Sequence, residues 1–155
     1  MSLQNQKAPA FILPDQNNKN HSLVDYHGQW VLVYFYPKDD TPGCTIEACS
    51  FRDAWKNFKD ADIQVLGISA DSSASHQKFA EKFKLNFPLL ADVDKKVVND
   101  YGVWVEKSMY GKKYMGIQRD SFLINPDGVI VKHYIKVKPE EHSAEILRDI
   151  KNYKK

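Results

Sequence analysis

Two cysteines, Cys44 and Cys49, are the only ones in this chain of 155 residues, and they lie five positions apart. Cys44 follows the segment Pro-Lys-Asp-Asp-Thr-Pro-Gly, where a hydrophobic strand is predicted to give way to a helix. Unpaired backbone N–H groups and the helix dipole favour a thiolate at a helix N-terminus, and the thiolate is the reactive form. A second thiol nearby in sequence can capture the oxidised species that the first one forms. The pair therefore predicts redox chemistry at a strand-to-helix junction.

The five-residue spacing also constrains how the two cysteines can react. On an ideal helix, residues five apart differ by about 140° in direction, and their Cα atoms lie about 8.6 Å apart. A disulfide requires a Cα–Cα distance of roughly 4.4–6.8 Å. Cys44 and Cys49 therefore cannot bond while both remain in a regular helix. If they do pair, the first turns of that helix must unwind.

Other chemistries for the two cysteines are less favoured. Both could simply be small buried hydrophobic residues, as free cysteines often are. A zinc site is disfavoured because there is no Cys-x-x-Cys motif and the five histidines show no ligand spacing. A cysteine protease would need a partner histidine, and the sequence nominates none. A dithiol oxidoreductase, or a redox-sensing module acting on protein partners, is the main alternative, although its cysteines are normally separated by two residues rather than four.

The bulk composition is that of a soluble globular protein. Hydrophobic residues make up 43% and the formal net charge is +2, so no footprint for nucleic acid or membrane is expected. The sequence shows neither a signal peptide nor a stretch of about 20 apolar residues that could span a membrane. No glycine-rich nucleotide loop is present, so no nucleotide or flavin cofactor is expected. We expect a single domain over residues 1–155, located in the reducing cytoplasm.

Hydrophobic patterns place the secondary structure. Apolar runs predict strands at 29–36, 63–69, 89–91, 121–124 and 129–137. Helices are expected at 44–58, at 73–83 and from residue 139 onward. A further helix is expected to end at residue 101, with Asp92 or Asp94 as its N-cap. In the first helix, spacings of 4, 3, 4 and 3 define an inward stripe made of Cys44, Ala48, Phe51, Trp55 and Phe58. Cys49 is expected to point away from this stripe.

The order of these elements predicts the fold class. Strands and helices alternate first, and a β-hairpin and a closing helix follow. Alternation gives parallel strands flanked by helices, whereas the terminal hairpin adds antiparallel pairing. We therefore expect an α/β, thioredoxin-like fold with a central mixed β-sheet, in which Cys44 lies at the first strand-to-helix junction.

The segment around Cys44 resembles a known family. The pattern Pro37-x-x-x-Thr41-x-x-Cys44 is similar to the active-site motif of the peroxiredoxins. Residues 34–49 look like the subgroup called bacterioferritin comigratory protein, or Q-type peroxiredoxins. The likeness continues through residues 66–69, 101–104 and 116–124, and thus covers nearly the whole chain in order.

This resemblance implies roles for five residues. Cys44 would be the peroxidatic cysteine, and Pro37, Thr41 and Arg119 would complete its pocket. The Thr41 hydroxyl can accept from the thiol or donate to the peroxide, Arg119 stays protonated and can polarise the peroxide, and Pro37 lacks an N–H and walls off water. Cys49 matches the resolving cysteine found in part of the family.

The resemblance also implies substrates and partners. The substrate would be hydrogen peroxide or an organic hydroperoxide, and thioredoxin, or glutaredoxin in its place, would act as reductant. Neither a cofactor nor a metal is expected. Resolution within one chain removes the need for a dimer, so a monomer is expected.

Overall fold

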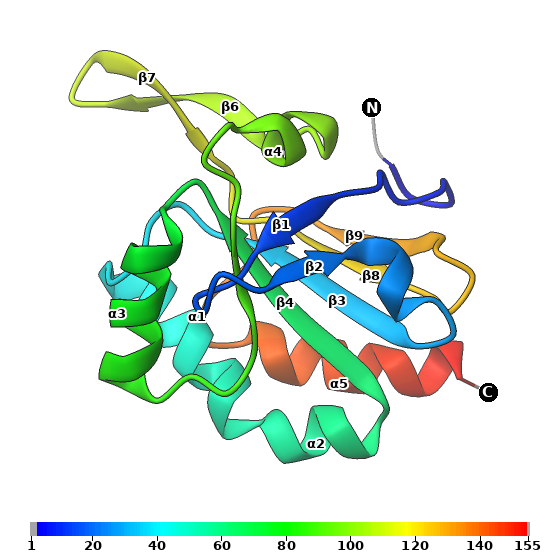
Figure 1. Cartoon of the computed structure of the whole chain (residues 1–155). Helices are drawn as coiled ribbons and strands as arrows, with labels where there is room; N and C mark the ends of the chain where they lie inside the picture. Colours follow the sequence, from blue (N-terminus) through cyan, green and yellow to red (C-terminus); the bar gives the residue numbers. More distant parts are fainter. Residues whose placement is uncertain (1–2, 155) are drawn as a thin grey trace.

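The computed structural model describes residues 3–154 and is built around a five-stranded sheet (Figure 1). The strands in spatial order are β5 (Leu89–Ala91), β4 (Ile63–Ser69), β3 (Trp30–Phe35), β8 (Ser121–Ile124) and β9 (Ile130–Tyr134). β3, β4 and β5 pair in parallel, whereas β8 is antiparallel to both β3 and β9. The expected mixed sheet is thus confirmed.

Helices cover both faces of this sheet (Figure 1). On one face lie α1 (Pro42–Asp53), α2 (Trp55–Asp60), α3 (Ser73–Phe83) and α5 (His142–Tyr153). The short helix α4 (Lys96–Asp100) packs on the opposite face. No helix within residues 3–154 has the length and apolar character needed to cross a membrane.

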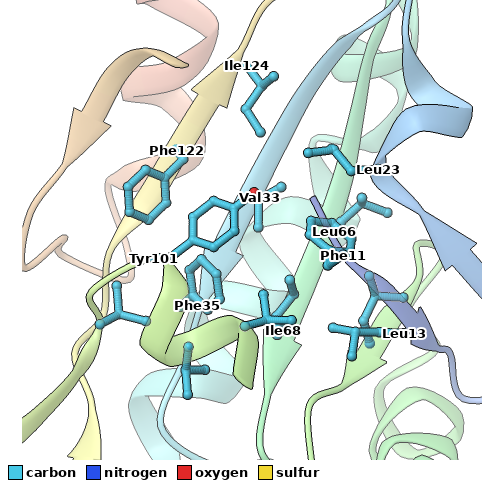
Figure 2. Close-up of a cluster of buried hydrophobic side chains, with 14 of the residues drawn as sticks. Phe11, Leu13, Leu23, Val33, Phe35, Leu66, Ile68, Tyr101, Phe122 and Ile124 are labelled. Atoms are coloured by element: carbon cyan, nitrogen blue, oxygen red, sulfur yellow. The ribbon is translucent and has the colours of Figure 1, made fainter. Parts of the chain in front are cut away.

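The central strand β3 separates two hydrophobic clusters because its side chains alternate between the faces. Val33 and Phe35 belong to the cluster shown in Figure 2, which also includes α4 and the N-terminal strand β1 (Ile12–Pro14). Leu32 and Tyr34 belong to the other cluster, which contains Cys44 and the inner faces of α1, α3 and α5. The continuous apolar run of β3 is therefore buried on both faces of the sheet.

A small antiparallel pair precedes the main sheet. β1 pairs with β2 (Asn20–Ser22), and the 3-10 helix η1 (Leu23–Tyr26) follows. The polar turn between them is organised by the Asp15 carboxylate, which accepts from the backbone N–H groups of Asn17 and Lys19 at 2.8 and 3.0 Å.

The helix expected over residues 44–58 is two helices. α1 begins two residues earlier, at Pro42, and the chain breaks at Ala54 before α2 starts. The break changes the phase of the inward stripe. Trp55 is 41% exposed, and the Lys59 ammonium lies 4.9 Å from its ring centroid. The prediction that Trp55 faces inward is therefore wrong, whereas Phe58 is buried as predicted.

Two predicted boundaries near the C-terminus also shift. β9 ends at Tyr134 rather than continuing to residue 137, because Lys136 has a positive φ of 50° that leaves the strand conformation. α5 begins at His142 rather than at residue 139. The Val137 N–H instead donates to the Arg119 carbonyl at 2.9 Å.

The N-terminus of α4 differs in part from the prediction that Asp92 or Asp94 is its N-cap. Its N-cap position is held by Lys95, which has a left-handed φ of 62°. Asp92 nevertheless supplies an acceptor, because its Oδ2 accepts from the Val98 N–H at 2.8 Å. This carboxylate satisfies an N–H group of the first helical turn that has no intrahelical partner.

A β-hairpin that the sequence did not predict extends from the body beside α4 (Figure 1). It consists of β6 (Trp104–Met109) and β7 (Lys112–Ile117), joined by Tyr110 and Gly111. Both turn residues have positive φ values, 54° and 79°, as a two-residue hairpin turn requires. β7 leads directly into the segment that carries Arg119.

The close approach of β4 to β3 gives a test of this packing. A Cβ at Gly67 would lie 2.8 Å from Cζ and 2.9 Å from the hydroxyl oxygen of Tyr34, whose ring is buried and stacks on Phe51. We expect Gly67→Ala to lower the free energy of unfolding in urea by about 1–3 kcal/mol through overpacking. Gly116→Ala, which meets only the flexible side chains of Lys107 and Tyr114, is the control. Equal effects of the two variants would contradict this account.

Candidate active site

Cys44 is the third residue of α1, the helix that follows the carboxyl end of β3. Its side chain is buried, with 1% exposed. Thr41 precedes the helix in an extended conformation, and the Thr45 N–H closes the first turn by donating to the Thr41 carbonyl at 2.8 Å. The first N–H groups of the helix have no intrahelical acceptor and, together with the helix dipole, they favour negative charge on the sulfur.

Arg119 joins two groups of α1 through its guanidinium. Nη2 donates to Cys44 Sγ at 3.4 Å, and Nη1 donates to Glu47 Oε1 at 2.9 Å. The Arg119 carbonyl is tied to the Val137 N–H, so the backbone that carries the guanidinium is held in place. Because a guanidinium stays protonated, it places a permanent positive charge against the sulfur. The structure thus brings Cys44 and Arg119 together.

Glu47 is a residue of this site that the sequence analysis missed. Its side chain is fully buried and forms an ion pair with Arg119. Burial raises the pKa of Glu47 to about 7, and the nearby Arg119 charge offsets only part of that rise. A signal was present in the sequence, because Glu47 lies three residues after Cys44 on the same helical face. A carboxylate within an apolar stripe needs a partner.

Two buried oxygens beside Cys44 have no hydrogen-bond partner among the described residues. They are the Tyr34 hydroxyl and Glu47 Oε2. Burial raises the pKa of Tyr34 well above its ordinary value, and the neighbouring Glu47 adds to the rise. The phenol therefore stays neutral.

Thr41 and Pro37 lie in the loop between β3 and α1. The Thr41 hydroxyl donates to the Lys38 carbonyl at 2.8 Å, so its lone pairs rather than its proton are free to meet a thiol or a peroxide. This arrangement fits the accepting role and not the donating one. Pro37 is half-buried directly after Tyr36. Within residues 3–154, the hydrogen-bonding side chain at the sulfur is Arg119 rather than Thr41.

Cys49 is separated from Cys44 although both belong to α1. Both thiols are free, but Cys44 is buried whereas Cys49 is half-buried. Cys49 lines a shallow hollow together with Ile46, Ser50, Glu140 and Ser143. This position matches the prediction that Cys49 points away from the inward stripe. The intact helix therefore holds the two thiols on different faces.

Comparisons with known proteins agree with this geometry. A model of the AhpC/TSA family matches residues 4–133. The putative peroxiredoxin bcp of Coxiella burnetii is 52% identical over 142 residues, which are 92% of this chain and 94% of that protein. Peroxiredoxin Bcp of Escherichia coli K12 is 49% identical over 146 residues, covering 94% of each chain.

Solved structures show the same similarity. Peroxiredoxin Q of Xanthomonas campestris superposes with a TM-score of 0.89 at 38% identity, covering 94% of this chain and 92% of that one. A trapped intermediate/ligand complex of the bacterioferritin comigratory protein of the same organism, solved to study its alkyl peroxide reduction activity, has a TM-score of 0.89 at 37% identity with the same coverage. The expected thioredoxin-like fold is confirmed.

Gly43 provides a test of the Arg119 contact. A Cβ at this position would lie 3.0 Å from Arg119 Nη2, the atom that donates to Cys44. We expect Gly43→Ala to displace the guanidinium and to slow oxidation of Cys44 by peroxide roughly tenfold, because small misplacements at a reacting centre are costly. Stability should be unchanged or slightly higher, since alanine favours a helix. Stopped-flow kinetics and urea unfolding measure the two effects, with the exposed Ile46→Ala as control.

The ionisation of Glu47 gives a second test. Its pKa is about 7 in the folded chain and 4.5 when exposed, so the folded state binds more protons between these values. Stability should therefore fall as the pH rises from 4.5 to 7, by about 3 kcal/mol at most. Glu47→Gln keeps an acceptor for Arg119 and should remove this slope. Urea unfolding across the pH range measures it, and the exposed Glu106→Gln should behave as the unsubstituted chain. If the stability of the Glu47→Gln variant fell with pH as steeply as that of the unsubstituted chain, the raised pKa would not belong to Glu47.

Proposed function

The chain belongs to the AhpC/TSA family and is a thiol peroxidase of the peroxiredoxin type, and we propose that Cys44 is its peroxidatic residue. The observation that supports this most strongly is the contact of Arg119 Nη2 with Cys44 Sγ at 3.4 Å. A buried thiol at a helix N-terminus, facing a permanent cation, favours the nucleophilic thiolate. Cys49 has no such contact among the described residues.

The proposed reaction begins with attack of the Cys44 thiolate on the O–O bond of a hydroperoxide. A sulfur–oxygen bond forms, the O–O bond breaks, and the departing oxygen takes the electron pair and a proton to leave as water or alcohol. Arg119 stabilises the negative charge that develops on that oxygen. The Thr41 hydroxyl, which donates to Lys38, can accept a hydrogen bond from the peroxide and orient it. Pro37 is proposed to exclude water from the reacting sulfur, because it lacks an N–H group. Cys44 is left as a sulfenic acid.

We propose that Cys49 then resolves the sulfenic acid. The Cys49 thiolate attacks the Cys44 sulfur, water leaves, and an intramolecular disulfide forms. Both cysteines belong to α1, so the first turns must unwind before the sulfurs can meet. Unwinding also removes Glu47 from its buried position beside Arg119. Exposure to solvent lets the Glu47 carboxyl ionise, and this ionisation offsets part of the free energy needed to unwind the first turns of α1.

The second half of α1 is anchored independently of Arg119. Phe51 is buried, the Ser50 and Ser143 hydroxyls lie 2.5 Å apart, and Arg52 Nη1 donates to the Phe83 carbonyl at 2.7 Å. These contacts attach residues 50–53 to α5 and to the end of α3. Unwinding is therefore expected to stop before residue 50, which leaves the rest of the fold intact.

The remaining parts of the cycle follow from the chemistry. An external dithiol, which we propose is thioredoxin or glutaredoxin, reduces the disulfide and restores both thiols. Hydrogen peroxide and organic hydroperoxides are the proposed substrates. Because resolution needs no second chain, we propose a monomer formed by one domain over residues 1–155. Dependence on a dithiol reductant supports a cytoplasmic location.

The alternative considered from the sequence, a thiol-disulfide oxidoreductase or redox-sensing module, is not favoured. The relatives at 45–52% identity are peroxiredoxins or putative peroxiredoxins. The burial of Cys44 also disfavours direct exchange with a large protein disulfide, which needs an accessible attacking sulfur.

Replacement of each cysteine tests the proposed cycle. Cys44→Ser should abolish peroxide consumption in a thioredoxin-coupled assay, because no other thiolate meets Arg119. Cys49→Ser should consume one equivalent of peroxide, accumulate sulfenic or sulfinic acid detectable by mass spectrometry, and fail to cycle. Normal cycling by Cys49→Ser would show that an external thiol resolves Cys44. Full activity of Cys44→Ser would overturn the assignment of the peroxidatic residue.

A further inference from the structure

A buried polar cluster lies behind the loop that connects β3 to α1. At its centre, the Asp39 carboxylate contacts His76 of α3, with 2.7 Å between Asp39 Oδ2 and His76 Nδ1. Tyr36 donates to Asp39 Oδ1 at 2.6 Å, and Ser75 donates to Oδ2 at 2.8 Å. The side chains of Asp39 and His76 are 4% and 0% exposed. This cluster lies outside the set of residues that contact Cys44.

The hydrogen-bond partners fix where the protons lie. His76 Nε2 is 2.9 Å from the Leu90 carbonyl, which can only accept, so Nε2 carries a hydrogen. Nδ1 faces a carboxylate oxygen that already accepts from Ser75, and the other carboxylate oxygen accepts from Tyr36. Nδ1 is thus the ring atom that binds Asp39, whereas Nε2 binds the Leu90 carbonyl.

The charged and titratable groups around His76 come from several elements. Tyr36, at the end of β3, has its hydroxyl 3.3 Å from Nδ1. Asp71, in the loop after β4, accepts from the Asp39 backbone N–H at 2.9 Å and from the Ser69 hydroxyl at 2.7 Å. Asp39 and Asp71 are thus the two carboxyl groups close to His76.

The cluster determines the path of the active-site loop. Asp39 is held through both its side chain and its backbone, and it lies between Lys38 and Asp40. The Lys38 carbonyl accepts from the Thr41 hydroxyl, which fixes the direction of that side chain. Asp40 has a left-handed φ of 55°, a costly conformation for a residue other than glycine. The contacts that Asp39 makes offset this conformational cost, and they direct the chain to the start of α1.

We propose that His76 is a positioning residue for the peroxidase reaction, acting through Asp39 on Thr41 and the first turn of α1. This proposal rests on the proposed role of Cys44. Loss of the contact between His76 Nδ1 and Asp39 Oδ2 would release the loop that carries Thr41. The reaction of Cys44 with peroxide should therefore slow when this contact is removed.

The side chains of Asp39, Asp71 and His76 could instead form a metal site. Their donor atoms all lie within 4.8 Å of one another. A metal would need the Nδ1 lone pair, whereas the short contact to a carboxylate places a proton there. We therefore infer a proton rather than a metal ion at this position.

Two substitutions that differ by one methylene test the proposal. Asparagine places its amide nitrogen near the position of Nδ1, so His76→Asn keeps a donor to Asp39. Glutamine places its nitrogen near Nε2, so His76→Gln keeps only the contact to Leu90. In stopped-flow oxidation by peroxide, we expect His76→Asn to stay within about twofold of the unsubstituted rate. His76→Gln should lose roughly tenfold or more.

The matched control is a second histidine–carboxylate pair in the β1–β2 hairpin. His21 Nε2 lies 2.7 Å from Asp15 Oδ2, and its Nδ1 lies 2.6 Å from the Tyr26 hydroxyl. His21→Asn and His21→Gln should leave the oxidation rate unchanged. Equal losses in the two His76 variants, or equal losses in the His21 variants, would overturn the positioning role.

The protonation of His76 is measured directly on the unsubstituted chain by 15N NMR of its imidazole. Nε2 should carry a proton, because it faces the Leu90 carbonyl, and a bare Nε2 would overturn the hydrogen-bond assignment on which the proposal depends. Inhibition by one equivalent of Zn²⁺ that a chelator reverses, and that His76→Asn lacks, would also overturn it. This NMR signal does not depend on turnover. If the unsubstituted chain failed to consume peroxide, the proposed function would fail separately.

Discussion

The site depends on one contact, in which the Arg119 guanidinium joins the sulfur of Cys44 to the carboxylate of Glu47. Both partners lie on α1 three residues apart, so a single cation holds the first turn of this helix. The opposite end of α1 is held by apolar packing, by the contact of Ser50 with Ser143 and by the hydrogen bond from Arg52 to the Phe83 carbonyl. In the proposed cycle, the contacts of Arg119 hold the end of the helix that opens, whereas the anchors of residues 50–53 hold the end that stays. A sulfenic acid at Cys44 would be a neutral group, so its contact with Arg119 would be weaker than that of a thiolate.

The elements that could be predicted from the sequence are those whose burial leaves a clear pattern. β3 and β4 are continuous apolar runs because helices cover both faces of the sheet at these strands. Cys44 could be placed because a proline–glycine turn marks the junction between strand and helix. Arg119 came from the family resemblance alone, since an isolated arginine before a strand carries no pattern of its own. Its place beside the sulfur is set by the antiparallel pairing of β8 with β3.

The elements that could not be predicted lack such a pattern for physical reasons. β6 and β7 form a two-stranded ribbon with most side chains exposed, so burial imposes little alternation on them. Their turn uses Tyr110, at a position where asparagine or aspartate would have given the usual signal. The break at Ala54 involves neither glycine nor proline. Glu47 could not be found from the amphipathic pattern, because that pattern considers only apolar residues. Glu47 is a charged residue on the same helical face.

The separation of 75 positions between Cys44 and Arg119 in the sequence also orders the events of folding. A chain emerging from the ribosome exposes Cys44 well before β8 has been made, so the thiol first exists without its cation. Central sheet pairing between β3 and β8 is a contact between distant parts of the chain and forms slowly. If Cys44 has the proposed role, the contact with Arg119 that supports its reactivity forms only when the second half of the sheet pairs with the first.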